Sequence, residues 1–320
     1  MVKNPRWIVY SLIFIALLFI PRILSIHDLM LFEYGITFAI VGLGFNLLLG
    51  YTGLLSFGHG AYFATGAYTV AMIAKYLPQA YSLEILIPAA LFFSLVLSII
   101  FGFVCVRHTK IFFSILTLSL SMLLFALLFK LYHLTGGSDG LRVPLPTMFG
   151  MSFKGIRRPE FLSGTYYYFL LGMFSVSFLV MKGIVSSPFG KALQAIRDNE
   201  VRAELIGIRV RRYRLYAFII SGMFVGLGGA LWTFVNGHVT ADLSHWVFSG
   251  EIVYMTLLGG FGIFEGPIVG AIIFTYLKLY AMGNTQYWMF VIGGTLIVLV
   301  LLLPNGIAGA FAGLWTKIKK

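Results

Sequence analysis

Gly136, Ser138 and Gly140 have the spacing G-x-S-x-G, which presents a nucleophilic serine in many hydrolases. That chemistry needs a sharp turn between a strand and a helix of an α/β sheet. Here the motif lies in a loop between two apolar segments, where a glycine-rich turn at a helix end explains it better. We therefore predict no catalytic residue at this motif.

Phosphate and metal motifs are also missing from the sequence. A phosphate-binding loop reads G-x-x-x-x-G-K-[ST], whereas Gly190-Lys191 is followed by Ala192, and Val185 stands at the first position. No H-E-x-x-H motif occurs, and the single Cys105 excludes an internal disulfide and a metal site built on thiolates. The sequence therefore predicts no ATPase of this type, no metal site and no cofactor held by the chain itself.

Charge is concentrated at residues 190–214, where ten of the 25 residues are charged. A solvated basic loop that fixes membrane topology would explain Arg209, Arg211, Arg212 and Arg214, which we assign to a membrane-facing cluster. It does not explain the three acids in the run, because acids contribute little to topology. Mixed charge around a small apolar face suits a docking surface, and we expect one here.

Two short amphipathic helices are predicted within this run, lying across the inner membrane surface. A serine before Pro188 can cap the first helix, since the hydroxyl binds free amides and proline fits the first turn. Asp198 or Asn199 can cap the second helix, and Gly207 suits its C-terminal end. The residues expected to form the docking surface are Leu193, Ile196, Arg197, Asp198, Glu200, Ala203, Glu204, Leu205 and Gly207.

The composition of the chain suits a bilayer rather than water. Of its 320 residues 59% are hydrophobic and 11% are charged, with a mean hydropathy of +0.94, whereas a soluble domain is about 25% charged. The net charge of +12 lies in short loops between apolar runs, which indicates membrane topology rather than a nucleic-acid partner. The N-terminal apolar run is followed by Pro21-Arg22 instead of a cleavage site, so we interpret it as an uncleaved membrane helix.

Apolar segments of about 20 residues predict an all-α, polytopic membrane protein with about ten spanning segments, some broken by glycine. The region 246–281 is too long for one helix, and Gly259-Gly260 and Gly266-Pro267 argue for a break within it. The segments are 7–26, 31–49, 53–76, 84–106, 111–132, 165–185, 214–236, 247–260, 266–281 and 286–303.

The distribution of Lys and Arg places both termini and the loop 186–213 inside, and the loop 133–163 outside. This outer loop carries Arg142, Lys154, Arg157 and Arg158, although the positive-inside rule favours basic residues on the cytoplasmic side. We expect Arg142, Arg157 and Arg158 to pair with acids on a docking protein.

Polar residues within the predicted spans are candidates for a translocation path, because they are costly in hydrocarbon. Asn46, Gly53, Ser56, His59 and Thr65 lie in a glycine-rich stretch where broken helix can turn polar groups toward water. For His59, a hydrogen-bonded packing role and a role in the path both remain open.

Charged residues near the predicted helix ends have simpler interpretations. We expect Glu33, Glu84, Lys75 and Lys130 to reach the membrane surface, and Glu265 to cap a helix. The small residues Gly222, Gly226 and Ala230 lie four apart, as do Gly262, Gly266 and Gly270. Such ridges let helices approach closely, and a role in gating is the alternative.

Five stretches of the sequence carry motifs in a fixed order: LGFNLLLGYTGLLSFGHGAYFATGAYT at 43–69, TGGSDGL at 135–141, the charged run at 190–208, YRLYAFIISGMFVGLGGAL at 213–231 and LLGGFGIFEGPIVGA at 257–271. Together they resemble the permeases that import branched-chain amino acids, which are subunits of ATP-binding-cassette importers. The resemblance is stronger to the LivM type than to the LivH type. Ala203 and Gly207 also match E-A-A-x-x-x-G, the pattern of this loop in older permease families, although Glu200 is one place early and Arg202 stands where Ala is usual.

The resemblance implies a single permease domain over 1–320 in the plasma (inner) membrane, which is a transport subunit and not an enzyme. A second, LivH-type permease would form the other half of the pore. Two cytoplasmic ATPases would bind ATP and the loop 186–213, and a separate solute-binding protein would deliver leucine, isoleucine, valine or related small amino acids or amides from outside. A self-sufficient secondary transporter or channel for a small polar solute is the alternative.

Overall fold

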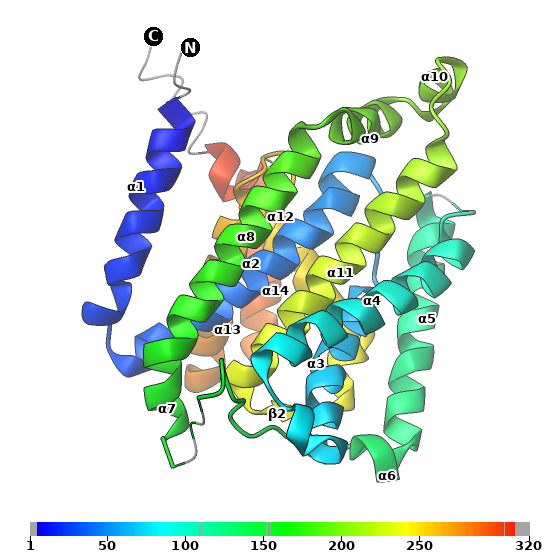
Figure 1. Ribbon diagram of the computed structural model, residues 1–320. Coiled ribbons are helices and arrows are strands. Elements are labelled where there is room, and N and C mark those ends of the chain that lie inside the picture. Colours follow the sequence, from blue (N-terminus) through cyan, green and yellow to red (C-terminus); the bar gives the residue numbers. More distant parts are fainter. Residues whose placement is uncertain (1–4, 109, 152, 154, 304, 311–320) are drawn as a thin grey trace.

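The computed structural model describes residues 5–108, 110–151, 153, 155–303 and 305–310, and helices dominate it (Figure 1). The helices are α1 (Pro5–Phe19), α2 (Ile26–Thr52), α3 (His59–Tyr76), α4 (Leu83–Cys105), α5 (Lys110–Lys130), α6 (Tyr132–Thr135), α7 (Arg158–Phe161), α8 (Tyr167–Ser186), α9 (Pro188–Asp198), α10 (Glu200–Leu205), α11 (Val210–Asn236), α12 (Trp246–Gly259), α13 (Gly266–Asn284) and α14 (Trp288–Leu302). Short 3₁₀ turns cover Ile20–Arg22, Pro78–Ala80 and Ala241–Ser244, and a π-turn covers Leu162–Tyr166.

Each predicted spanning segment overlaps a helix. Within the described residues six helices are long and apolar enough to cross a membrane, and three shorter ones are apolar. The number ten therefore stays a prediction, while the all-helical membrane architecture is confirmed in its coarser form. The break predicted near residue 260 is present, because α12 ends at Gly259 and α13 begins at Gly266.

One boundary differs clearly from the sequence prediction. The segment expected at 53–76 becomes helical only at His59, because Gly53 takes φ +73 and ends α2. A left-handed residue at a helix end is the usual role of glycine. The intervening residues Leu54–Gly58 form a non-helical linker between α2 and α3.

The core of the bundle is formed by α2, α3 and α11, whose backbones approach closely. A Cβ on Gly66 of α3 would overlap the carbonyl oxygen of Gly226 on α11, and a Cβ on Gly226 would overlap Ser94 of α4. Glycine leaves room for these contacts, as small residues commonly do between membrane helices. The packing interpretation of the ridge through Gly222 and Gly226 is therefore confirmed.

The two ends of the bundle carry different structures (Figure 1). One end carries α9 and α10, and the opposite end carries α6, α7 and a two-stranded sheet in which Leu141–Arg142 (β1) pairs antiparallel with His238–Val239 (β2). Gly136 (φ +76) caps α6, so the G-x-S-x-G motif is a turn at a helix end, as predicted. Ser138 Oγ donates to Asp139 Oδ1 at 3.2 Å there.

Helix α1 lies at the periphery and is joined to the bundle by two tyrosines. Pro21 has no N–H, so it cannot bond the carbonyl oxygen of Leu17 as a residue four places on normally does. The Tyr167 hydroxyl on α8 donates to this oxygen at 2.7 Å. Toward the other end of α1 the Tyr10 hydroxyl donates to Glu265. Contacts at Leu17 and Tyr10 therefore position a helix whose described surface is otherwise largely exposed.

Candidate functional site

The charged run forms α9 and α10, which together we call the arm (Pro188–Leu205), and the arm has the helix ends predicted for it. Ser187 Oγ accepts from the Gly190 amide at 3.4 Å at the start of α9. Asn199 Oδ1 accepts from the Arg202 amide at 2.9 Å at the start of α10. Gly207 takes φ +89 just after α10. The caps at Ser187 and Asn199 and the stop at Gly207 are confirmed.

The apolar residues of the arm divide into two sets, which corrects the predicted docking face. Leu193 and Ile196 are 0% and 2% exposed, because α9 packs against α2, α8 and α11 of the same chain. Ala203 is buried as well. Other residues of the same chain therefore cover these three side chains, which leaves them unavailable to a partner.

The free apolar surface of the arm lies on and just after α10. Val201, Leu205 and Ile206 are 67%, 82% and 70% exposed. Glu204 and Asp198 lie exposed in the same arm. Of the predicted apolar contact residues, Leu205 is the one available to a partner. Val201 and Ile206 belong to the apolar residues of the predicted second helix but were not among the predicted docking residues.

Arg214 does not belong to the membrane-facing basic cluster, which corrects that assignment. It is 6% exposed, and its Nη1 and Nη2 atoms lie 2.6 and 2.8 Å from the Glu200 carboxylate oxygens. The pair connects the start of α10 with the second turn of α11. Arg209, Arg211 and Arg212 are exposed, as the assignment expected.

Arg197 is also directed into its own chain. Its Nη1 donates to the carbonyl oxygen of Gly50 on α2 at 2.5 Å, and its Nη2 lies 3.2 Å from Asp198 Oδ1. A Cβ on Gly53 would come within 3.1 Å of Arg197 Cγ. The arm thus contacts the stretch predicted to line the translocation path.

That stretch, Asn46 to Thr65, is mostly buried in this chain. His59 is 0% exposed, and its Nδ1 and Nε2 atoms each lie 2.8 Å from a serine hydroxyl, Ser56 and Ser221 respectively. The packing interpretation of His59 is therefore the one that its contacts support. Thr65 Oγ1 donates to the Ala61 carbonyl at 2.8 Å.

Within the described part of the chain, two side chains of α2 have buried polar atoms without a hydrogen-bond partner. Asn46 Oδ1 and both carboxylate oxygens of Glu33 have no hydrogen-bond partner among the described residues. Glu33 is 0% exposed, so the expectation that it reaches the membrane surface is wrong. It faces the bundle because α2 is covered here by neighbouring helices, which its position near a helix end could not reveal.

Two further carboxylates are paired with lysines on other helices. Lys278 Nζ on α13 lies 2.6 Å from Glu251 Oε2 on α12. Glu265 precedes α13 without capping it by its side chain, which corrects that expectation. Its carboxylate instead accepts from Tyr10 and from Lys182 Nζ, the latter at 3.1 Å. Burial raises the pKa of Glu265, but these two donors and the positive charge of Lys182 outweigh it and lower the pKa.

The loop 133–163, which we predicted to lie outside, contains an arginine that we expected to pair with a docking protein. Arg158 donates to the carbonyl oxygens of Phe234 at 2.7 Å and Val143 at 2.5 Å, so its guanidinium is engaged within the chain. Arg142 and Arg157 are exposed, and Lys154 lies outside the described residues.

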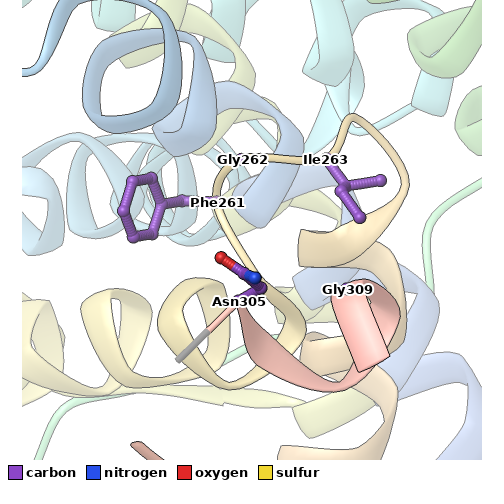
Figure 2. Close-up of a pocket in the computed structure, with 5 residues that line it drawn as sticks. All are labelled: Phe261, Gly262, Ile263, Asn305 and Gly309. Carbon is purple, nitrogen blue, oxygen red and sulfur yellow. The ribbon is translucent and has the colours of Figure 1, made fainter. Parts of the chain in front are cut away.

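A cavity of ≈ 310 Å³ lies beside the turn between α12 and α13 (Figure 2). Phe261, Gly262, Ile263, Asn305 and Gly309 line it. Phe261 also contacts the end of α2, since a Cβ on Gly50 would come 2.5 Å from its carbonyl oxygen. The described residues contain no group of three or more His, Cys, Asp or Glu side chains placed to hold a metal ion.

The fold is that of a polytopic helical membrane protein that carries a capped arm at one end. Residues 29–300 match the family described as the permease component of branched-chain amino acid transport systems, and the chain belongs to that family. The resemblance predicted from the sequence is confirmed, and the chain is a permease subunit of an ATP-binding-cassette importer. No solved structure matches the chain.

Individual relatives agree with this assignment. The chain is similar to the high-affinity branched-chain amino acid transport system permease protein LivM of Escherichia coli K12, with 28% identity over 84% of this chain and 67% of the relative. It is 24% identical to LivH of the same organism over 86% of this chain and 92% of the relative. The galactose/methyl galactoside import permease MglC of Haemophilus influenzae is 28% identical over 43% of this chain and 46% of the relative.

Proposed function

We propose that this chain forms half of the membrane pore of an importer for leucine, isoleucine, valine or related small amino acids or amides. A related LivH-type permease supplies the other half, two ATPases on the cytoplasmic side bind ATP and the arm, and a solute-binding protein delivers substrate on the opposite side. Both termini lie in the cytoplasm. The names of the relatives support the substrate class, and the similarity to both LivM and LivH supports the pairing of two permeases.

One observation carries the proposal for the arm. Val201, Leu205 and Ile206 expose their side chains on an arm whose caps, buried Leu193 and ion pair to α11 hold its shape. Exposed apolar groups cost free energy in water, and a partner surface that covers them recovers it. Glu204 beside them can fix the register of the partner by charge.

The test replaces Leu205 by Asp, with Leu205→Met as the matched control. Insertion of an unpaired charge into an apolar contact costs several kcal/mol, and each 1.4 kcal/mol is a tenfold loss in affinity. We expect Leu205→Asp to lose ATPase co-purification and substrate-stimulated hydrolysis in the assembled complex, while Leu205→Met keeps both. If the Asp variant inserts normally and keeps both at the parental level, the arm is a solvated loop.

A self-sufficient secondary transporter is the second candidate, and two observations favour it. The Glu251–Lys278 pair lies between apolar helices, and Glu33 is a buried carboxylate; ion-coupled carriers use such groups. Reconstitution of the chain alone in liposomes separates the two. Under the lead proposal, labelled leucine does not accumulate under any ion gradient until the second permease and the ATPases are added. Accumulation by the chain alone would establish the carrier instead.

A further inference from the structure

Helix α2 ends beside the arm with a carbonyl group that its own helix does not satisfy. The Gly53 amide bonds the Leu49 carbonyl at 3.2 Å, and the Leu54 amide bonds the Leu48 carbonyl at 3.3 Å. In a continuing helix the Leu54 amide would have bonded Gly50 instead. The last carbonyls of a helix need donors from elsewhere, and this applies to Gly50.

Arg197 is the donor, and its geometry suits the task. Its Nη1 lies 2.5 Å from the Gly50 oxygen, where the helix dipole favours a cation. Asp198 Oδ1 accepts from Nε and Nη2 at 3.3 and 3.2 Å and orients the guanidinium. Gly53 leaves room for the side chain, because a Cβ there would press on Arg197 Cγ at 3.1 Å.

The end of α2 continues into the linker Leu54–Gly58, which is held by α5. Ser114 Oγ donates to the Leu55 carbonyl at 2.6 Å, and the Phe57 amide donates to Thr117 Oγ1 at 3.3 Å. The linker then enters α3 at His59, which is bonded to Ser221 of α11. These contacts link the end of α2 to three further helices, α5, α3 and α11.

We infer that Arg197 is a positioning residue that joins the arm to the end of α2, so that displacement of the arm by the ATPases moves the linker Leu54–Gly58. The inference rests on the proposed function of the arm for its consequence in transport. Its structural half, that Arg197 holds the end of α2 against the arm, concerns this chain alone. Arg197 acts inside the permease, whereas Leu205 acts at the partner surface, and the two residues therefore fail in different ways when replaced.

The structural half is tested by hydrogen exchange of the chain alone in nanodiscs. Arg197→Gln removes the charged cap, Arg197→Lys keeps a cation, and Arg211→Gln removes an exposed arginine nearby. Loss of one charge-assisted hydrogen bond speeds exchange of the Gly53 and Leu54 amides about tenfold or more in the Gln variant. The Lys and Arg211 variants stay near the parent. Parental exchange in Arg197→Gln, or equal acceleration in Arg197→Lys, overturns the inference.

If Arg197→Gln does not insert into the membrane, Asp198→Asn replaces it in the hydrogen-exchange experiment. It keeps the guanidinium but weakens its second anchor, so exchange of the same two amides rises by a smaller factor. Parental exchange in this variant, with Arg197→Gln unfolded, counts against the inference because the anchored cap is then not what protects these amides.

The transport half is tested in the assembled complex by the number of ATP molecules hydrolysed per leucine imported. Arg197→Gln raises this ratio several-fold and keeps ATPase co-purification, whereas Arg197→Lys returns it toward the parent. An unchanged ratio, or loss of ATPase binding in Arg197→Gln, overturns the inference. Absence of leucine uptake in the parent complex refutes the proposed function instead, and the exchange experiment still decides the role of Arg197.

Discussion

The guanidinium of Arg214 and the carboxylate of Glu200 form a two-point pair, with Nη1–Oε1 and Nη2–Oε2 distances of 2.6 and 2.8 Å. The pair joins the start of α10 to the second turn of α11, because Glu200 is the first residue of α10 and Arg214 is the fifth residue of α11. Planar guanidinium and carboxylate groups match in this geometry, which a lysine cannot reproduce. The arm is therefore fixed to α11 by a contact with defined orientation.

Replacement of Arg214 by Gln is expected to destabilise the arm. Removal of one member of a buried pair costs about 3–5 kcal/mol, but the Glu200 side chain is 39% exposed and water compensates it, so we expect about 1–2 kcal/mol. Protease accessibility of the arm and ATPase co-purification measure the effect. Arg211→Gln is the control, and the double variant Glu200→Gln/Arg214→Gln recovers part of the loss because no charge stays unpaired. If Arg214→Gln matches the parent in protease accessibility and ATPase co-purification, Arg214 does not hold the arm and its original assignment to the basic cluster stands.

The Tyr167–Leu17 hydrogen bond predicts a coupling between Tyr167 and Pro21. Tyr167→Phe leaves the Leu17 carbonyl without its donor and lowers the free energy of unfolding by about 1 kcal/mol. Pro21→Ala restores an amide that can bond the same carbonyl, so Tyr167→Phe costs less in that background. A double-mutant cycle on thermal unfolding in detergent measures the difference. Tyr168→Phe, at an exposed side chain, is the control, and additive effects of the two changes contradict the assignment.

Glu265 gives the attachment of α1 a pH dependence. Its pKa is lowered from the ordinary 4.5 in the folded chain, although burial alone would raise it, because Tyr10 and Lys182 stabilise the carboxylate. A carboxylate with a lowered folded pKa contributes its full stability above the unfolded value and loses it as the pH falls toward the folded value. Accessibility of α1 to protease should therefore rise as the pH falls below about 4.5.

Glu265→Gln is the matched variant for this experiment. It cannot ionise, so its α1 should be as accessible at neutral pH as the parent is in acid, and the pH step should disappear. Tyr10→Phe removes one donor while leaving the Lys182 ion pair, which gives an intermediate pH step. A step of parental size in Glu265→Gln would assign the dependence to another group.

The arm shows which parts of this structure could be predicted from sequence. Its two helices were predictable because Ser187, Asn199 and Gly207 act on their immediate neighbours, and local backbone chemistry does not depend on the rest of the fold. The burial of Leu193 was not predictable, since periodicity identifies an apolar face but not whether the same chain or a partner covers it. Leu205 is also a leucine of the arm, yet its side chain is exposed.

Charged residues show the same limit more strongly. Arg214 follows three other arginines within six residues, and nothing local distinguishes it; its partner Glu200 is found only once α10 folds back beside α11. Lys278 and Glu251 lie on neighbouring helices 27 residues apart in the chain. Glu33 looked like a residue at a helix end because α2 starts at Ile26, five residues earlier than the hydropathy suggested. Three-dimensional neighbours, not sequence position, determine these roles.

The last prediction concerns the sides of the membrane. The arm and the outer loop lie at opposite ends of the bundle (Figure 1), so an exposed position in each must react with an impermeant thiol reagent from opposite sides. Arg157 and Glu204 are both exposed, and Cys105 is 0% exposed; we replace Cys105 by Ala and introduce Arg157→Cys or Glu204→Cys. With both termini in the cytoplasm, intact cells with a permeable outer membrane label Arg157→Cys, while Glu204→Cys reacts only after the inner membrane is broken. The reverse pattern inverts the orientation that the positive-inside rule gives, and labelling of both from one side contradicts the separation of the arm from the outer loop.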